Sequence, residues 1–252
     1  MKKKLLVALV VVGLCSTVAL AFDPMGPPAA GLGKGKTSLG IEYIWNKMEF
    51  ERNTRSWSGS DRTPKFDPMQ KVYGVFGYGL ADNVDVFARA GAAWADYELS
   101  ASSGNWDFDG STSFVWGLGM KATLAEEPGV KWGFLAQYSF ARLRGEQTRD
   151  GDDENWQMQL DELQIAFGPT WTPSQGLCIY GGPFLHWIRG TEERDQWGDT
   201  YRYSVEEENW VGGYIGAQLD VAQNCVFNME WLQTADDMAV AAGLIFRQSR
   251  RL

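Results

Sequence analysis

Large apolar residues alternate with small or polar ones along most of the chain after residue 36. The first such segment carries its apolar residues on odd positions: Leu39, Ile41, Tyr43 and Trp45. The same split recurs around residues 112–124 and 130–141. A period of two residues indicates β-strands with one apolar face, and we find no amphipathic helical run of useful length. The sequence therefore predicts an all-β fold.

The alternating segments predict about ten strands, with eight as the alternative count. Their ranges are 36–50, 70–80, 84–97, 112–123, 130–143, 157–170, 177–189, 209–221, 225–233 and 237–248. Tight turns follow strands two, four, six and eight, whereas roughly 13 to 19 residues follow strands one, three, five and seven. An up-and-down meander in which short and long connections alternate has all its short turns at one end, as transmembrane barrels do. We expect a closed antiparallel transmembrane β-barrel.

The second face of each strand decides which side meets the lipid. It consists mainly of Gly, Ala and Ser, which cover a water-exposed surface poorly but suit a narrow lumen. The apolar face is aliphatic in the middle and aromatic near the strand ends, as a bilayer requires. The residues predicted to form these two aromatic belts are Trp45, Trp94, Trp132, Trp171, Trp187 and Phe246. A soluble barrel with its apolar face inward is the alternative.

The chain starts with a short apolar run that differs from the rest. Three lysines precede it and Ala19-Leu20-Ala21 ends it, so we interpret residues 1–21 as a signal peptide. Removing it changes the net charge from −9 to −12. The Pro- and Gly-rich residues 22–35 are expected to form a periplasmic lead-in, and residues 36–252 the barrel domain.

Composition narrows the possibilities further. The chain has 252 residues, and its mean hydropathy of −0.28, with a single apolar run, excludes a polytopic helical membrane protein. The sequence pI near 4.7 argues against a nucleic-acid partner.

Several charged residues fall on the predicted inner face. They are Glu42, Arg89, Lys121, Lys131, Asp220, Glu230 and Arg247, accompanied by Gln137, Gln164 and Gln218. Because buried charges must be paired, we expect a lumen charge network centred on Glu42, Arg89, Lys121 and Glu230. Such a network either fills the lumen as a structural element or lines a narrow conducting pore.

Two segments and the signal peptide carry a resemblance to a known class. The hairpin FGYGLADNVDVFARAG and the last strand MAVAAGLIF resemble small bacterial outer-membrane β-barrel proteins over residues 36–248. The resemblance implies an outer-membrane location, contact with membrane lipid and lipopolysaccharide, and insertion by the outer-membrane assembly machinery. One departure is that residues 247–252 follow Phe246, whereas members of this class usually end on the aromatic residue.

Enzymatic residues are scarce. The only histidine is His186, and the position two before it is Phe184 rather than the aspartate of omptin-like barrel proteases. Lipid A deacylases, which also resemble this class of barrel, have a serine two positions after the histidine, where this chain has Ile188. We therefore expect a satisfied lumen histidine, no enzymatic activity and no cofactor.

The long connections are acidic and contain tryptophans. The acidic runs are 107–109, 150–155 and 206–208, which offer oxygen ligands to divalent cations but do not fit an EF-hand. Cys178 is predicted to face inward and Cys225 outward, so we expect no disulfide. The sequence favours a structural or narrow-pore, porin-like role. An adhesin or ligand-binding barrel is the alternative, and a barrel hydrolase comes after it.

Overall fold

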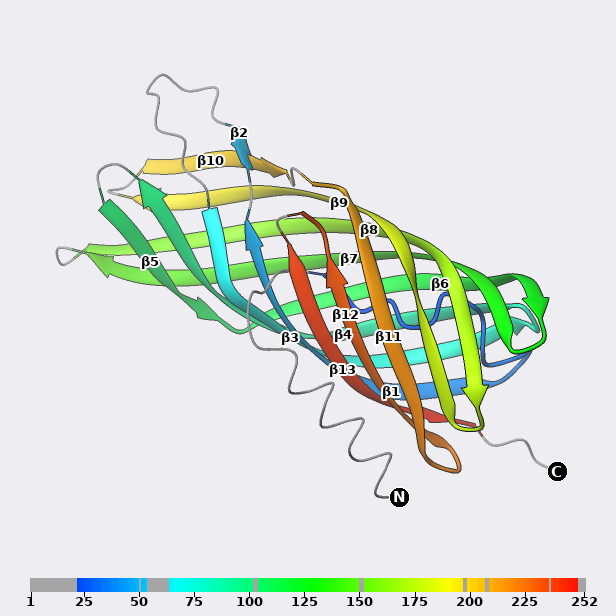
Figure 1. The fold of residues 1–252 in the computed structure, drawn as a ribbon. Coiled ribbons are helices and arrows are strands. Elements are labelled where there is room, and N and C mark those ends of the chain that lie inside the picture. The colour runs from blue at the N-terminus through cyan, green and yellow to red at the C-terminus, as the bar shows by residue number, and fades with distance from the viewer. Residues whose placement is uncertain are drawn as a thin grey trace, which may run out of the picture.

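The structure is a computed structural model, and it describes residues 22–49, 51–53, 64–101, 104–149, 152–196, 199–206, 209–235 and 237–248. Within these ranges every regular element is a β-strand, and no helix is long and apolar enough to cross a membrane. The strands wrap into an elongated antiparallel barrel (Figure 1). The predicted all-β class is confirmed.

Thirteen strand segments form the wall. Their bounds are β1 Thr37–Glu49, β2 Glu51–Asn53, β3 Pro64–Ala81, β4 Val84–Ala101, β5 Gly104–Ser111, β6 Ser113–Glu127, β7 Val130–Arg149, β8 Asp152–Ser174, β9 Leu177–Gln196, β10 Asp199–Glu206, β11 Val211–Ala222, β12 Cys225–Gln233 and β13 Met238–Arg247. Three consecutive pairs act as single interrupted strands. β5 and β6 both pair with β4 and β7, β10 and β11 both pair with β9, and β2, which follows β1 after one residue, pairs with β10. The wall is therefore a ten-stranded barrel closed by the pairing of β13 with β1.

The short turns all lie at one end of the barrel, as expected. They join β3 to β4, β6 to β7, β8 to β9 and β11 to β12, and β1 begins and β13 ends at that same end. At the opposite end the strands run further than predicted: β8, for example, spans residues 152–174 rather than 157–170. The acidic run 107–109 and much of 150–155 therefore belong to strands instead of loops, because the wall continues past the aromatic belt.

The strand pairing changes along the length of the barrel. β10 pairs directly with β2 through Ser204↔Asn53, Val205↔Arg52 and Glu206↔Glu51. Nearer the short turns, the β12–β13 hairpin lies between β11 and β1. The ladder of this hairpin ends at Gln233↔Met238. The pairing of β10 with β2 therefore lies beyond the ladder of the hairpin, toward the long connections. The predicted count of ten strands is confirmed, and the alternative of eight is not.

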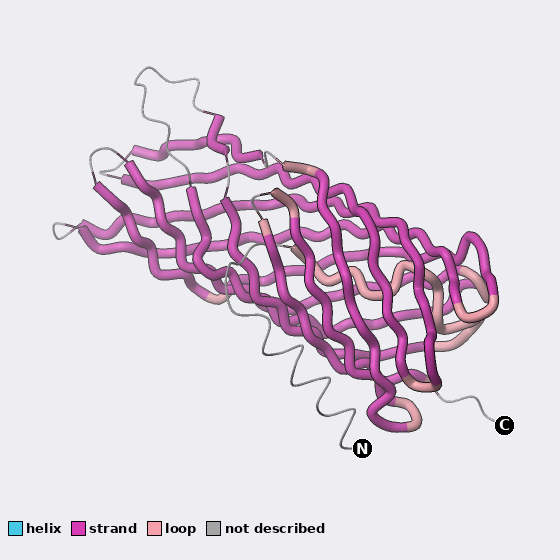
Figure 2. The backbone as a smooth tube through the Cα atoms, in the orientation of Figure 1, coloured by secondary structure: helices cyan, strands magenta, loops and turns pink. Residues whose placement is uncertain are grey.

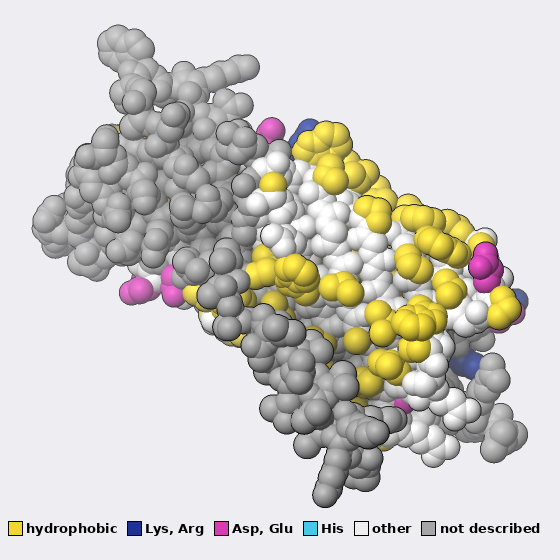
Figure 3. All heavy atoms as spheres, in the orientation of Figure 1, with side chains coloured by type: hydrophobic (Ala, Val, Ile, Leu, Met, Phe, Trp, Pro, Cys, Tyr) yellow, Lys and Arg dark blue, Asp and Glu magenta, His cyan; other side chains and the backbone are white. Residues whose placement is uncertain are grey.

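The outer face is apolar and the inner face carries the polar groups. Large side chains exposed on the outside include Leu39, Ile41, Phe114, Leu118 and Leu124. Figure 3 shows such side chains spread over the visible part of the barrel wall, with the visible charges near its two ends. This distribution is the reverse of a soluble barrel and matches the predicted lipid-facing surface.

Residues 22–30 lie inside the barrel, and residues 31–35 lead to its short-turn rim, where Gly31, Lys34 and Gly35 are exposed. Phe22, Asp23 and Met25 are at most 1% exposed. Figure 2 shows the segment as a loop without secondary structure that runs between the walls of the barrel. We expected a periplasmic lead-in. Its hydrogen bonds go to inward-facing side chains from opposite sides of the wall, which a segment outside the barrel could not reach.

The exposed apolar belt predicts that a charged side chain on the outer face lowers the free energy of unfolding by an amount that depends on its depth in the bilayer. Leu118→Arg, in the middle of β6, is expected to lower the free energy of unfolding in lipid vesicles by about 2–4 kcal/mol, because the guanidinium meets hydrocarbon. Leu124→Arg, near the short-turn end of the same strand and on the same face, should cost about 0–1 kcal/mol. Urea titrations of the two variants compare them, and equal costs would contradict the lipid-facing assignment.

Candidate functional site

The most densely bonded part of the lumen surrounds Asp23. Lys71 Nζ lies 2.7 Å from Asp23 Oδ1 and 3.4 Å from Glu162 Oε2, while Arg89 Nη1 lies 3.8 Å from Asp23 Oδ2. The Tyr73 hydroxyl is within 3.3 Å of both Asp23 oxygens. These side chains are all buried. Side chains of β3 and β4 therefore converge on the Asp23 carboxylate, while Glu162 of β8 contacts Lys71 and accepts the Asp23 backbone N–H.

Glu230 on β12 holds the next two residues of the segment. Its Oε1 accepts the Met25 backbone N–H and its Oε2 accepts the Gly26 N–H, each at 2.7 Å. Gly26 has φ of +66°, and a Cβ there would come within 2.7 Å of Lys121 Nζ. The backbone conformation favours glycine, whereas the flexible Lys121 side chain could move away from a Cβ. A single buried carboxylate thus satisfies two backbone donors of a segment without secondary structure.

Asp85 on β4 repeats this arrangement closer to the short turns. Its Oδ2 accepts the N–H groups of Gly31 at 2.7 Å and Leu32 at 3.1 Å. At the barrel end the segment joins the wall through backbone bonds, with Gly35 N–H donating to Gly79 O at 2.7 Å. The segment therefore has side-chain anchors along its length and a backbone anchor where β1 begins.

Two wall glycines make room for the segment. A Cβ at Gly133 would lie 2.2 Å from the backbone nitrogen of Ala29, and a Cβ at Gly79 would lie 1.9 Å from the carbonyl oxygen of Gly33. Real Cβ atoms do not approach backbone this closely. The small inner-face residues that predicted a narrow lumen thus include positions that only glycine can fill while the segment is seated.

Phe22 anchors the inner end of the segment by apolar contact. Its ring packs edge-on against Phe184 and His186, with centroid distances of 5.1 and 4.5 Å. His186 is fully buried, and its Nε2 lies 3.1 Å from Glu162 Oε1. The histidine thus lies in the lumen beside Glu162 and touches the N-terminal segment.

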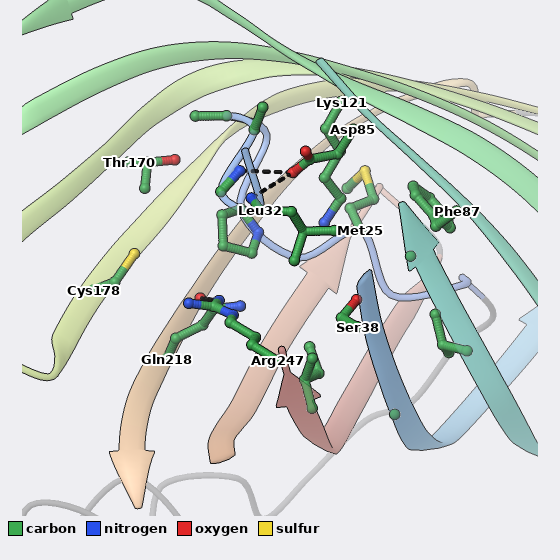
Figure 4. A pocket seen from close by; sticks show the side chains of 18 of the residues that line it. Met25, Leu32, Ser38, Asp85, Phe87, Lys121, Thr170, Cys178, Gln218 and Arg247 are labelled. Carbon is green, nitrogen blue, oxygen red and sulfur yellow. Dashed lines mark hydrogen bonds between the residues drawn. The ribbon is translucent and has the colours of Figure 1, made fainter. Parts of the chain in front are cut away.

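A cavity of about 310 Å³ remains between the segment and the wall near the short turns. Figure 4 shows Asp85 bonded to the segment beside Leu32, with Arg247, Gln218 and Cys178 across the space. Glu42 and Lys121 also line it. Among the described residues, Glu42 Oε2 and Asp85 Oδ1 are buried side-chain oxygens without a hydrogen-bond partner. The cavity is therefore a polar vestibule next to the segment.

The lumen beyond Phe22, toward the long connections, is filled by wall side chains. The Tyr97 and Trp156 rings stack at 4.5 Å, and the Tyr97 hydroxyl donates to Glu192 at 3.0 Å. Arg194 Nη2 lies 3.4 Å from the same carboxylate. Buried aliphatic and methionine side chains surround this group: Met69, Leu143, Met158, Leu160 and Val205. The interior is thus polar around the segment and largely apolar beyond it.

The structure brings together some of the charged residues predicted to form the network. Glu42, Arg89, Lys121, Lys131 and Arg247 line the same cavity, and Glu230 on β12 binds the segment beside it. Toward the short-turn rim Lys131 pairs with Glu126 at 3.2 Å and Arg247 donates to Gln218 at 2.9 Å. Asp220 is exposed and does not line the cavity.

Four central residues were not predicted: Asp23, Lys71, Asp85 and Glu162. Lys71, Asp85 and Glu162 share the strand parity of their inward-facing neighbours, so extending the alternation to β3, β4 and β8 would have identified them. Asp23 carries no such signal, because it lies outside any strand. Gln137, which donates to Gln164 and accepts from Arg89 Nη2, joins this centre as expected for an inward residue.

The predicted aromatic belts are distributed as follows. Trp171 and Phe246 are exposed on the outside near the short turns, at 49% and 54%. Trp45, Trp94, Trp132 and Trp187 are half-buried, and Trp132 stacks on Phe167 while Trp187 lies near Trp210. Cys178 and Cys225 are both free. Within the described ranges, no group of three or more acidic, histidine or cysteine side chains could hold a metal ion.

Comparisons with known proteins identify the fold. No protein-family model matches the chain, and no curated protein matches it. The outer membrane protease OmpT from Escherichia coli is similar in structure, with 13% identity, a TM-score of 0.58, and coverage of 87% of this chain and 99% of that one. The translocator domain of the autotransporter NalP from Neisseria meningitidis aligns with 10% identity, a TM-score of 0.50, and coverage of 98% and 95%.

These similarities show the fold, which is that of outer-membrane β-barrel proteins. The expected class of structure and the expected outer-membrane location agree with it. These two structures have different roles, one a protease and the other a translocator domain. The role of this chain therefore has to be inferred from the residues of its own lumen.

Lys71 provides a test of the buried cluster. Lys71→Met is expected to lower the free energy of unfolding by about 3–5 kcal/mol, because it leaves Asp23 and Glu162 buried without their cation. Lys131→Met removes a lysine whose side chain is 43% exposed and paired with an exposed glutamate, so it should cost about 0–1 kcal/mol. Denaturant titration of both variants measures the difference, and similar small costs would contradict the cluster.

Gly133 provides a test of the seated segment. Gly133→Ala places a methyl group against the Ala29 backbone and should destabilise the closed lumen by about 1–3 kcal/mol. Gly74→Ala is the matched control, since a Cβ there is 3.7 Å from its nearest neighbour on the outer face. Limited proteolysis of residues 22–35 in the folded barrel is the measurement. Equal protection in both variants would mean that the segment does not pass Gly133.

Proposed function

We propose that this protein is an outer-membrane barrel that acts as a narrow pore for small solutes and is held closed by its own residues 22–35. The observation that carries the proposal is the capture of this segment by the carboxylates of Glu230 and Asp85 inside the wall. Around the segment the closed state is built from hydrogen bonds and ion pairs, which can open. Passage of a solute also requires side chains such as Tyr97 and Trp156 to move aside in the half nearer the long connections.

The character of the wall around the segment supports a pore. Lys71, Arg89 and Glu162 face the lumen, and the polar cavity borders the segment at the short-turn end. When the segment leaves, these groups face water, which lowers the cost of separating them from their partners. Charged rings of this kind set the selectivity of narrow pores.

His186 supports a role without catalysis. A catalytic histidine must come within hydrogen-bond reach of a substrate. Here the ring is fully buried beneath Phe22 and beside Glu162. In this arrangement it stabilises the closed lumen, and we include the absence of hydrolytic activity in the proposal.

The test is the conductance of planar bilayers containing the native barrel and a variant lacking residues 22–32. The shortened chain keeps 33–36, where the backbone bonds to Gly79 anchor the start of β1. Heat-modifiable migration first verifies that each protein is folded. We expect brief, rare openings from the native barrel and a steady open level from the shortened one.

A synthetic peptide of residues 22–35 supplies the control. Added to the short-turn side of the shortened barrel, it should restore the closed state, and a scrambled peptide of the same composition should not. A folded shortened barrel that fails to conduct would overturn the pore and favour a structural role.

A further inference from the structure

Buried charges surround the N-terminal segment. Five carboxylates meet there: Asp23, Glu42, Asp85, Glu162 and Glu230. Three cations lie among them, Lys71, Arg89 and Lys121, and Arg247 and Lys131 line the same cavity nearer the short turns. A charge in a lumen shielded from water is costly without a close partner of opposite sign, and a carboxylate of this cluster can hold a further cation.

The expected processing of the chain supplies one. Cleavage after Ala21 makes Phe22 the first residue and turns its backbone nitrogen from a neutral amide into an α-ammonium group. Phe22 is fully buried, so this new charge forms inside the lumen rather than in solvent. The uncleaved chain has no cation at this nitrogen.

The geometry around Phe22 fits an ammonium. The next backbone nitrogen, that of Asp23, already donates to Glu162 Oε1 at 3.2 Å. Neighbouring backbone nitrogens are about 3–4 Å apart, which puts the Phe22 nitrogen within about 7 Å of that oxygen. The Phe22 ring lies 4.5 Å from His186, which also contacts Glu162 Oε1. Glu162 is thus the carboxylate placed to receive the new charge.

We infer that the α-ammonium of Phe22, released by signal-peptide cleavage, is a structural cation of the lumen that pairs with Glu162 and fixes the N-terminal segment in place. Cleavage therefore completes the closed barrel as well as releasing the chain from its targeting signal. This inference concerns the anchoring of the segment and holds whether or not the barrel conducts.

The first experiment identifies the terminus. N-terminal sequencing of the denatured, membrane-extracted protein should begin at Phe22. An amine-reactive reagent used near neutral pH should leave this terminus unmodified in the folded barrel and modify it after denaturation. A different first residue, or equal labelling in both states, would overturn the inference.

The second experiment removes only the charge. The chain beginning at Phe22 is refolded with a free or an Nα-acetylated terminus, and the temperature of half conversion to the slow-migrating form is compared on gels. Acetylation should lower this temperature by about 5–10 °C. It should also speed hydrogen exchange at the Met25 and Gly26 amides, a readout that does not depend on conductance.

Glu162→Gln gives the matched comparison. In this variant the carboxylate that receives the ammonium is gone, so acetylation of Phe22 should change the unfolding temperature little. Equal shifts in the native and Glu162→Gln chains would show that the pairing partner is wrong. No shift in either chain would overturn the inference.

Discussion

The structure depends on how the inward-facing carboxylates find partners. Pairing of the strands satisfies the backbone of the wall, but side chains on the inner face have no water-filled channel around them in the closed state. Glu230 and Asp85 each accept two backbone N–H groups from residues 22–35, and Glu162 accepts one. The segment in turn has no secondary structure to satisfy its own amides. Each side supplies what the other lacks, so wall and segment are stable together.

This mutual dependence shapes the rest of the barrel. The segment fits only where the wall carries glycine, as at Gly79 and Gly133. The β12–β13 hairpin ends at Gln233 and Met238, and β10 pairs with β2 beyond it, toward the long connections. In that part of the barrel, wall side chains such as Tyr97 and Trp156 fill the interior. The lumen is therefore filled by the segment nearer the short turns and by side chains nearer the long connections.

Much of this fold could be predicted from the sequence, because the alternation of two residues reports which face of a strand meets lipid. Leu39 and Ile41 face outward and Glu42 inward, as the pattern requires. The same parity places Lys71 and Glu162 inside. The position of Asp23 could not be predicted this way, since an irregular Pro- and Gly-rich segment has no period and its contacts come from residues far away in the chain. The strand extensions at the long-connection end were also missed, because their polar composition is typical of loops.

Hydrogen exchange at the backbone amides of Met25, Gly26, Gly31 and Leu32, measured in the membrane-embedded barrel, tests the central claim most directly. These four donors are bonded to buried carboxylates only when residues 22–35 are seated in the barrel. The account predicts slow exchange at all four, comparable to strand amides of the wall. Exchange at the rate of an unstructured peptide would contradict it, because the segment would then lie in water outside the barrel.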